Sequence, residues 1–360
     1  MYHYTVIQWL FFFYFYCFCG WCFESTYVSI KTKKLTNRGF MRGPFLPIYG
    51  SGAIMMLVVS MPFKDSLILT YIAGCIGATA LEYVTGVTME ALFKVRYWDY
   101  SKNKFNFQGH ICLGSSLAWG FLTILMTEFV HVPVERFVLS IPSQILTVVT
   151  LILTAGIFAD FALSFKAAID LRNVLIKMEQ AKEELVRIQK RLDVIVALTS
   201  ESASNYKEGI TESVAELKKS IEGKLESIKN IAFAKPSAYL DSVKEEVLDL
   251  KTRYTLNVER RNQASGLKDF FQRDMIRSNP TMTSVRFKEA LEELKQKIRK
   301  SEIRAEEQNK FLRSLQKAKG CKKLNIQLIE SLIEKITVSS DGVIDIQFRF
   351  KNEAGGECDA

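Results

Sequence analysis

Two glutamates inside an apolar stretch are the residues of this sequence best suited to chemistry. Glu82 and Glu90 interrupt residues 66–93, which are otherwise mostly apolar. A spacing of eight residues sets two helical side chains about 80° apart, so both carboxylates share one side of a helix, with Gly86 between them. A carboxylate at membrane depth is costly unless it faces other helices or water, which makes both candidate proton or cation sites. The simpler alternative is that Glu82 only bonds neighbouring helices and Glu90 reaches the lipid headgroups.

Glu24 ends the first apolar run and completes the candidate intramembrane polar site with the other two glutamates. Snorkelling at the membrane surface is the simpler explanation for Glu24, as it is for Asp160 in the last run. Cys17, Cys19 and Cys22 lie close together, but helical spacing spreads them over more than one face, and no His or carboxylate completes a ligand set. We therefore expect no metal site and no cofactor, and cysteines that pack as small apolar residues.

Two loops that are rich in glycine, aromatic and charged residues separate the apolar stretches. Residues 37–50 carry Gly and Pro at a density that predicts a structured turn or a re-entrant entry instead of a regular helix start. In the second loop, aromatic residues suit a membrane interface, and Asp99 or Ser101 could cap a turn. We expect these loops to form a cytoplasmic mouth with the candidate residues Arg38, Arg42, Trp98, Asp99, Asn106 and His110.

The apolar stretches predict five membrane crossings. A helix needs roughly 20 apolar residues to cross a bilayer, and such stretches cover about residues 5–28, 44–63, 66–93, 111–130 and 139–163. A cleaved signal peptide does not fit the first stretch, because no basic segment precedes it and no cleavage site of small residues follows it. We expect an all-α membrane fold with a five-helix transmembrane bundle in residues 1–165.

Basic residues predict the orientation of this bundle, because Lys and Arg in short loops stay on the cytoplasmic side. The loops after the first and third crossings are strongly basic, whereas the loops after the second and fourth crossings are balanced in charge. The basic residues are Lys31, Lys33, Lys34, Arg38 and Arg42 in one loop, and Lys94, Arg96, Lys102 and Lys104 in the other. We therefore expect an N-terminus outside the cell and a C-terminus in the cytoplasm.

Charge divides the chain into two parts. Up to residue 165 there are 11 basic and 8 acidic residues, against 37 and 31 in the remaining 195. The first part is too apolar for an ordinary soluble domain and the second too charged to enter a bilayer, which excludes a single globular enzyme domain. Since both parts have clear apolar patterning, disorder throughout is also excluded.

The charged part predicts cytoplasmic coiled-coil helices in residues 166–320. Apolar residues recur there every three or four positions with charges between them. Residues 199–209 lack this pattern and predict a break or hairpin, and Pro236 ends the second series. The apolar residues of each series form one stripe, or seam, along a helix. Whether these seams pack against another copy or against the same chain stays open. The series are Leu171, Leu175, Met178, Leu185, Ile188, Leu192 and Ile195; Ile210, Val214, Leu217, Ile221, Leu225 and Ile228; and, more weakly, Leu291, Leu294, Ile298 and Ala305.

Residues 321–360 predict a small α+β-hairpin element with a loose end. Apolar residues between 336 and 350 alternate with polar ones around Asp341-Gly342, which indicates a β-hairpin. Residues 327–353 resemble the C-terminal tails of large serine recombinases, but no nucleophile region precedes them.

Residues 268–286, which come before this element in the sequence, mix basic and aromatic side chains that could meet anionic lipid or nucleic acid. Helix packing with solvated charges is the simpler explanation.

Over residues 5–165 the sequence resembles the bacterial membrane family called putative ABC-transporter type IV, or CmpB-like. The resemblance rests on Gly20-Trp21 with Glu24, on residues 37–50, on Glu82-Tyr83 through Glu90, on residues 98–101 and on residues 106–112. A weaker similarity to the same family follows at Arg277-Ser278-Asn279-Pro280. Here His110 stands where the family leads us to expect Arg. The resemblance implies a permease-like component in a bacterial inner membrane, with an ATPase, if one is used, on a separate chain, because no Gly-rich phosphate loop is present.

We therefore expect a multi-pass membrane component of a transport system, of unknown substrate, in which Glu82 and Glu90 form the polar core. The alternative is a membrane-anchored scaffold or sensor whose coiled coil recruits partners or joins two copies, since a minimal permease does not need the long charged part. We expect no enzyme, because the three histidines are scattered and no metal or nucleophile motif is present. Nucleic acid is an unlikely partner, because charges of both signs are interspersed.

Overall fold

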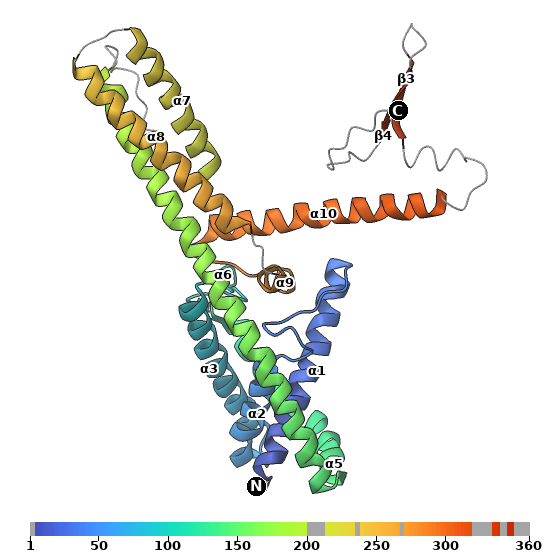
Figure 1. The fold of residues 1–360 in the computed structure, drawn as a ribbon. Helices are drawn as coiled ribbons and strands as arrows, with labels where there is room; N and C mark the ends of the chain where they lie inside the picture. Colours follow the sequence, from blue (N-terminus) through green and yellow to red (C-terminus); the bar gives the residue numbers. More distant parts are fainter. Residues whose placement is uncertain are drawn as a thin grey trace. The chain divides into compact units, whose positions relative to one another are not determined.

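The computed structural model describes residues 4–199, 213–234, 238–266, 270–318, 333–338 and 344–348, and the chain is mostly helical (Figure 1). Contacts between residues group the chain into two compact units, Met1–Glu293 and Leu294–Ala360. The first unit contains all the long apolar helices and every candidate site residue named above.

The first helices begin where the sequence provides a cap. The helix α1 (Val6–Thr32) starts after Thr5, whose side chain accepts the backbone N–H of Gln8 while the Gln8 side chain accepts that of Thr5. The helix α2 (Pro47–Ser60) has proline at its first position, where no N–H is needed, and continues into the short 3-10 helix η1 (Met61–Phe63). The helix α3 (Leu67–Phe93) follows Ser66, whose side chain accepts the backbone N–H of Leu69.

The fourth apolar stretch is longer than its sequence predicts. It runs through α4 (Leu113–Ile124), a π-helical turn η2 (Leu125–Val130) and α5 (His131–Ser140). The helix therefore continues ten residues beyond residue 130, where the crossing was predicted to end, and the end of the crossing itself stays a prediction. Pro133 does not end the helix, because it lies in the first turn of α5 directly after the π turn, where its missing N–H costs little.

Four helical segments are long and apolar enough to cross a membrane: Val6–Thr32, Leu67–Phe93, Leu113–Ser140 and Ser143–Ala197. The remaining apolar segment, Pro47–Phe63, has 17 residues and is too short to count with these four among the described helices. At 1.5 Å per residue it spans about 25 Å, against roughly 30 Å of hydrocarbon. The fifth crossing therefore stays a prediction.

One helix joins the apolar and the charged parts of the chain. The helix α6 (Ser143–Thr199) is 57 residues long, or about 85 Å at the helical rise, and continues through residue 165 without a break. Its first half packs against α1 and α3. Its second half packs against α7 (Val214–Ala234) and α8 (Ala238–Ser265).

The apolar seams of the charged part pack against one another within the same chain. Their common core contains Leu185, Ile188, Leu192, Ile195, Val214, Leu217, Ile221, Ile228 and Leu250. The seams of α6 and α7 therefore pack against each other and against α8. A second copy could bind these seams only by displacing the helices that cover them. Coiled-coil geometry and joining of two copies stay predictions. Residues 200–209 of the expected break, Ile210 and Pro236 lie outside the described residues.

The remaining elements are shorter or less apolar. The helix α9 (Phe270–Ser278) precedes α10 (Lys288–Ala318), in which Leu291, Leu294 and Ile298 are buried while Ala305 is exposed. The strands β3 (Ile333–Val338) and β4 (Ile344–Phe348) pair antiparallel, which confirms the two predicted strands. The predicted turn Asp341-Gly342 and Phe350 lie outside the described residues.

Candidate functional site

Glu82 is buried inside a candidate membrane span. Its side chain is 6% exposed, and it is held by three neutral donors from other segments. The Tyr100 hydroxyl donates to Oε1 at 3.0 Å, the Trp119 indole N–H to Oε2 at 2.9 Å, and the Ser115 hydroxyl to Oε2 at 3.3 Å. Among the described residues no cation pairs with it. The carboxylate therefore has hydrogen bonds but no counter-charge.

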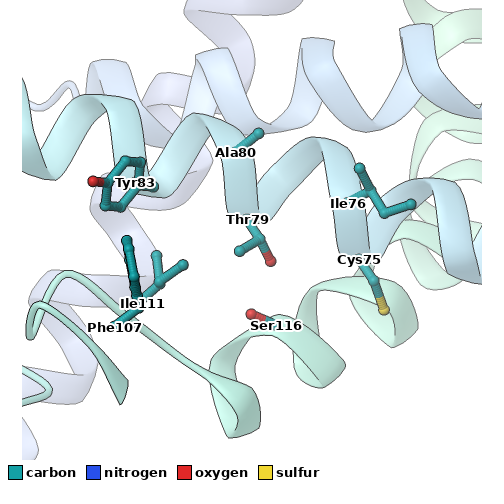
Figure 2. Close-up of a pocket in the computed structure, with 8 residues that line it drawn as sticks. All are labelled: Cys75, Ile76, Thr79, Ala80, Tyr83, Phe107, Ile111 and Ser116. Carbon is teal, nitrogen blue, oxygen red and sulfur yellow. The ribbon is translucent and has the colours of Figure 1, made fainter. Parts of the chain in front are cut away.

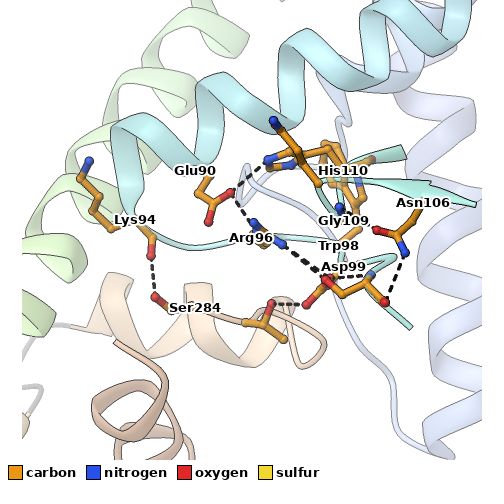
Figure 3. A network of polar contacts seen from close by, with 12 residues as sticks. Glu90, Lys94, Arg96, Trp98, Asp99, Asn106, Gly109, His110 and Ser284 are labelled. Carbon is orange, nitrogen blue, oxygen red and sulfur yellow. Dashed lines mark hydrogen bonds and ion pairs between the residues drawn. The ribbon is translucent and has the colours of Figure 1, made fainter. Parts of the chain in front are cut away.

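Glu90 lies in a charged network at the end of α3 (Figure 3). Its Oε2 is 2.8 Å from Nε of Arg96 and 3.0 Å from Nε2 of His110. His110 is almost fully buried, at 4% exposed, and its ring packs beside Gly86, where an added Cβ would lie 2.9 Å from Nδ1. Gly86 is therefore needed for close packing between α3 and the loop.

Asp99 extends this network toward the second loop and beyond. Its Oδ1 accepts the Ser101 backbone N–H and hydroxyl and lies 3.7 Å from Nη1 of Arg96, and its Oδ2 accepts the Thr283 hydroxyl at 3.2 Å. Burial by itself would raise the pKa of Asp99, but the hydrogen bonds from Ser101 and Thr283 and the Arg96 charge outweigh it and lower the pKa below its ordinary value.

Trp98 and Asn106 act as structural residues of the same loop. The Trp98 indole N–H donates to the His110 carbonyl at 2.9 Å, and the Asn106 amide donates to the Asn103 carbonyl at 2.8 Å. The short strands β1 (Asn106–Phe107) and β2 (Ile111–Cys112) pair antiparallel around Gly109, whose φ of +75° favours glycine. This hairpin, which the sequence did not predict, orients His110 toward Glu90.

Glu24 forms a separate polar group with residues of the first loop. The Tyr49 hydroxyl donates to Oε2 of Glu24 at 3.0 Å, and Nε of Arg38 is 3.5 Å from Oε1. Asp160 accepts the Gly43 backbone N–H at 2.9 Å, which ties α6 to the same loop. Glu24 and Asp160 therefore hold the first loop in place and do not contact Glu82 or Glu90 directly.

A segment distant in sequence covers both loops. Arg38 donates from Nη1 to the Ser278 carbonyl at 3.2 Å and to Oδ1 of Asn279 at 3.1 Å, and Asn279 donates back to the Gly39 carbonyl at 2.9 Å. Arg42 lies 3.6 Å from Asp274 and stacks on the Phe271 ring, 4.1 Å from its centroid.

The second loop holds the same segment through its backbone. Arg96 and Thr283 exchange two hydrogen bonds of 2.7 and 2.9 Å, and the Ser284 hydroxyl donates to the Lys94 carbonyl at 2.7 Å. We call residues 270–287 the docking segment. Of the residues considered above for lipid or nucleic acid, Phe270 and Phe271 thus pack against Arg42 of the first loop in the same chain.

The structure brings most of the predicted mouth together and adds residues that the sequence analysis missed. Arg96 was counted only as one basic loop residue, yet it contacts Glu90, Asp99 and the docking segment. The donors to Glu82 were also missed. Trp119, which lies within an apolar span and away from the usual interfacial position of tryptophan, was the available signal.

An apolar groove lies beside the polar site (Figure 2). Its volume is about 470 Å³, and it is lined by Cys75, Ile76, Thr79, Ala80, Tyr83, Phe107, Ile111 and Ser116. None of the predicted site residues lines it. Separately, no group of three or more His, Cys, Asp or Glu side chains within the described ranges could hold a metal ion.

Together, the long apolar helices and the polar side chains enclosed between them define a helical membrane protein. Residues 11–165 match the model of the family described as "Putative ABC-transporter type IV", which confirms the resemblance over this part of the chain. Searches among curated proteins and among solved structures found no match.

Proposed function

We propose that this protein is a permease-like membrane component of a transport system, and that Glu82 binds the proton or cation that this component handles. One observation carries the proposal: Glu82 is 6% exposed, lies within a candidate span and has three neutral donors but no paired cation among the described residues. A buried carboxylate without a counter-charge gains most from taking up a proton or a small cation. The family description supports a transport role.

We further propose the topology that the basic residues indicate, with five crossings, an outside N-terminus and a cytoplasmic C-terminus in a bacterial inner membrane. The two basic loops support it, because Arg38 and Arg96 both contact the docking segment and so lie at the same end of the apolar helices. Pro47–Phe63 can cross only with help from flanking residues or local thinning of the bilayer. An ATPase, if one drives transport, is a separate chain.

The proposal for Glu82 is tested with the full chain in liposomes that enclose a pH-sensitive dye. After an external acid pulse, we expect faster proton entry than in empty liposomes, and a loss of roughly tenfold or more in Glu82→Gln, because an amide cannot carry the proton. Glu128→Gln is the matched control, since Glu128 lies on the exposed side of another span. Equal entry with wild type and Glu82→Gln would remove Glu82 from the proposal.

The second candidate function is a membrane-anchored scaffold or sensor. The docking segment favours it, because it connects the cytoplasmic helices to both loops of the membrane part. Two variants separate the candidates. A scaffold should retain its cytoplasmic partners in Glu82→Gln and lose them in Asn279→Ala, whereas a permease should lose proton entry in the first variant.

A further inference from the structure

A second buried ionisable group lies at the other end of the apolar helices. His131, the first residue of α5, is 1% exposed. It lies on the same span as Trp119, twelve residues further along, which is about 18 Å at the helical rise. Thr123 and Thr127 lie between them, but their hydroxyls donate to carbonyls of their own helix. His131 therefore belongs to a site distinct from Glu82.

Both ring nitrogens of His131 face tyrosine hydroxyls. Oη of Tyr16 is 2.8 Å from Nδ1, and Oη of Tyr4 is 3.0 Å from Nε2. The Tyr4 hydroxyl donates in turn to Oε1 of Glu135. Phe12, which is fully buried, packs edge-on against the imidazole with 5.0 Å between ring centroids. The imidazole is thus enclosed by aromatic rings and bonded on both sides.

These contacts determine the tautomer of the neutral ring. Because Tyr4 uses its own proton to bond Glu135, its oxygen can only accept from the imidazole, so Nε2 carries the hydrogen. The other nitrogen, Nδ1, then accepts the Tyr16 hydroxyl. A hydroxyl both donates and accepts, so the same partners also suit a doubly protonated ring after Tyr16 turns its hydrogen away. A carbonyl partner would not allow this exchange.

Glu135 connects the buried ring to the surface. His131 and Tyr16 are buried, whereas Tyr4 and Glu135 are both partly exposed. The other charged group that acts on the ring is Lys64, from the segment between η1 and α3. When a doubly protonated His131 releases its Nε2 proton to Tyr4, the Tyr4 proton passes to the Glu135 carboxylate. The products are a neutral imidazole protonated at Nδ1, an intact tyrosine and a neutral carboxyl group.

We propose that His131 is a proton-exchange site at the end of the span opposite Glu90, which takes up and releases protons through Tyr4 and Glu135. Its ligand is the proton itself, and the site stands whether or not the chain is a permease. The proposal depends on the geometry of four side chains: two from α5, Tyr16 from α1 and Tyr4 from just before α1.

The test is ¹⁵N-histidine NMR of the full chain in lipid nanodiscs. The chain has three histidines, so the His131 signals are identified by their absence in His131→Gln. We expect a neutral ring with a single proton, on either nitrogen, at about pH 8 and conversion to the doubly protonated form toward about pH 5. Signals that keep one neutral form across this range would overturn the proposal.

Two variants test the route. Glu135→Gln and Tyr4→Phe should each reduce the doubly protonated fraction of His131 at the same acidic pH. Glu135→Gln removes the carboxylate, and Tyr4→Phe removes the hydroxyl that connects this carboxylate to the imidazole. Tyr4→Phe keeps the aromatic ring that packs against Trp9 and Phe12. Glu128→Gln, which removes a carboxylate from the exposed side of the same span, should leave this fraction unchanged. A fraction equal to wild type in Glu135→Gln would refute the route through Glu135.

Discussion

Arg96 shows how single residues decide the chemistry of the mouth. The family resemblance leads us to expect Arg where this chain has His110, so a fixed positive charge next to Glu90 was in doubt. The structure supplies this charge from Arg96, whose Nε is 2.8 Å from the Glu90 carboxylate, while His110 occupies the other side of the same oxygen at 3.0 Å. Glu90 is thus paired with two cationic or ionisable side chains, whereas Glu82 has no paired cation among the described residues.

At this scale we predict a pH-dependent effect of Asp99→Asn. Hydrogen bonds and Arg96 lower the pKa of Asp99 below its ordinary value of 3.8, so the ionised group stabilises the fold above that pH, and this contribution is lost as the pH falls through the lowered pKa. Asp99→Asn should reduce the free energy of unfolding at neutral pH by roughly 0.5 kcal/mol, because Asp99 is exposed and solvent screens its charge. Thermal unfolding in detergent at several pH values measures the loss.

The loss should disappear in strong acid, where both wild type and variant are neutral at this position. Asp65→Asn is the control, because Asp65 is exposed and lies in a different loop. A loss of the same size at neutral and acidic pH would show that the Asp99 charge does not contribute.

Among the elements, the docking segment contacts both loops of the membrane part of the first unit. It approaches the first loop through Arg38 and Asn279 and the second through a backbone pair with Arg96. Side-chain bonds alone could form in several registers, but the Arg96–Thr283 bridge fixes one. The segment therefore ties together two loops that α2 and α3 separate in the sequence.

For this element we predict that Arg38→Gln and Asn279→Ala release the docking segment. Each removes hydrogen bonds at a partly or fully buried contact, one of them with a charged donor, so amide hydrogen exchange in residues 275–287 should become roughly tenfold faster. Hydrogen-exchange mass spectrometry of the full chain measures this. Lys288→Gln, at an exposed position just beyond the segment, is the control, and unchanged exchange in both variants would mean that these bonds do not hold the segment.

For the whole molecule, polar groups occur at three depths of the apolar helices. The Glu90 network lies at one end, Glu82 lies within the span, and the His131 cluster lies at the other end. Ionisable groups at successive depths are expected in a protein that moves protons or ions, and not in a simple anchor. The groove near Thr79 and Ser116 lies beside this series and contains none of its residues.

At this scale we predict the topology of the chain. Reporters that respond to compartment, fused after Asp65 and after Lys166, should report outside and cytoplasm respectively, because both strongly basic loops stay inside. The fusion after Asp65 also tests whether Pro47–Phe63 crosses, since a cytoplasmic signal there would leave only the four long spans. The full chain should remain in vesicles washed with alkaline carbonate, and its release would contradict the membrane assignment.

The sequence by itself determined the long apolar helices, the mostly helical fold, the two antiparallel strands and the family resemblance, because the exclusion of charge from hydrocarbon and the periodicity of apolar residues are local properties. It also selected Glu82, Glu90 and most of the mouth. Only the tertiary structure decided which groups meet: the three donors to Glu82, the bridge from Arg96 to Thr283 and the Tyr4–His131 contact join residues up to 187 positions apart. Such partners depend on how helices pack, and no local pattern specifies them.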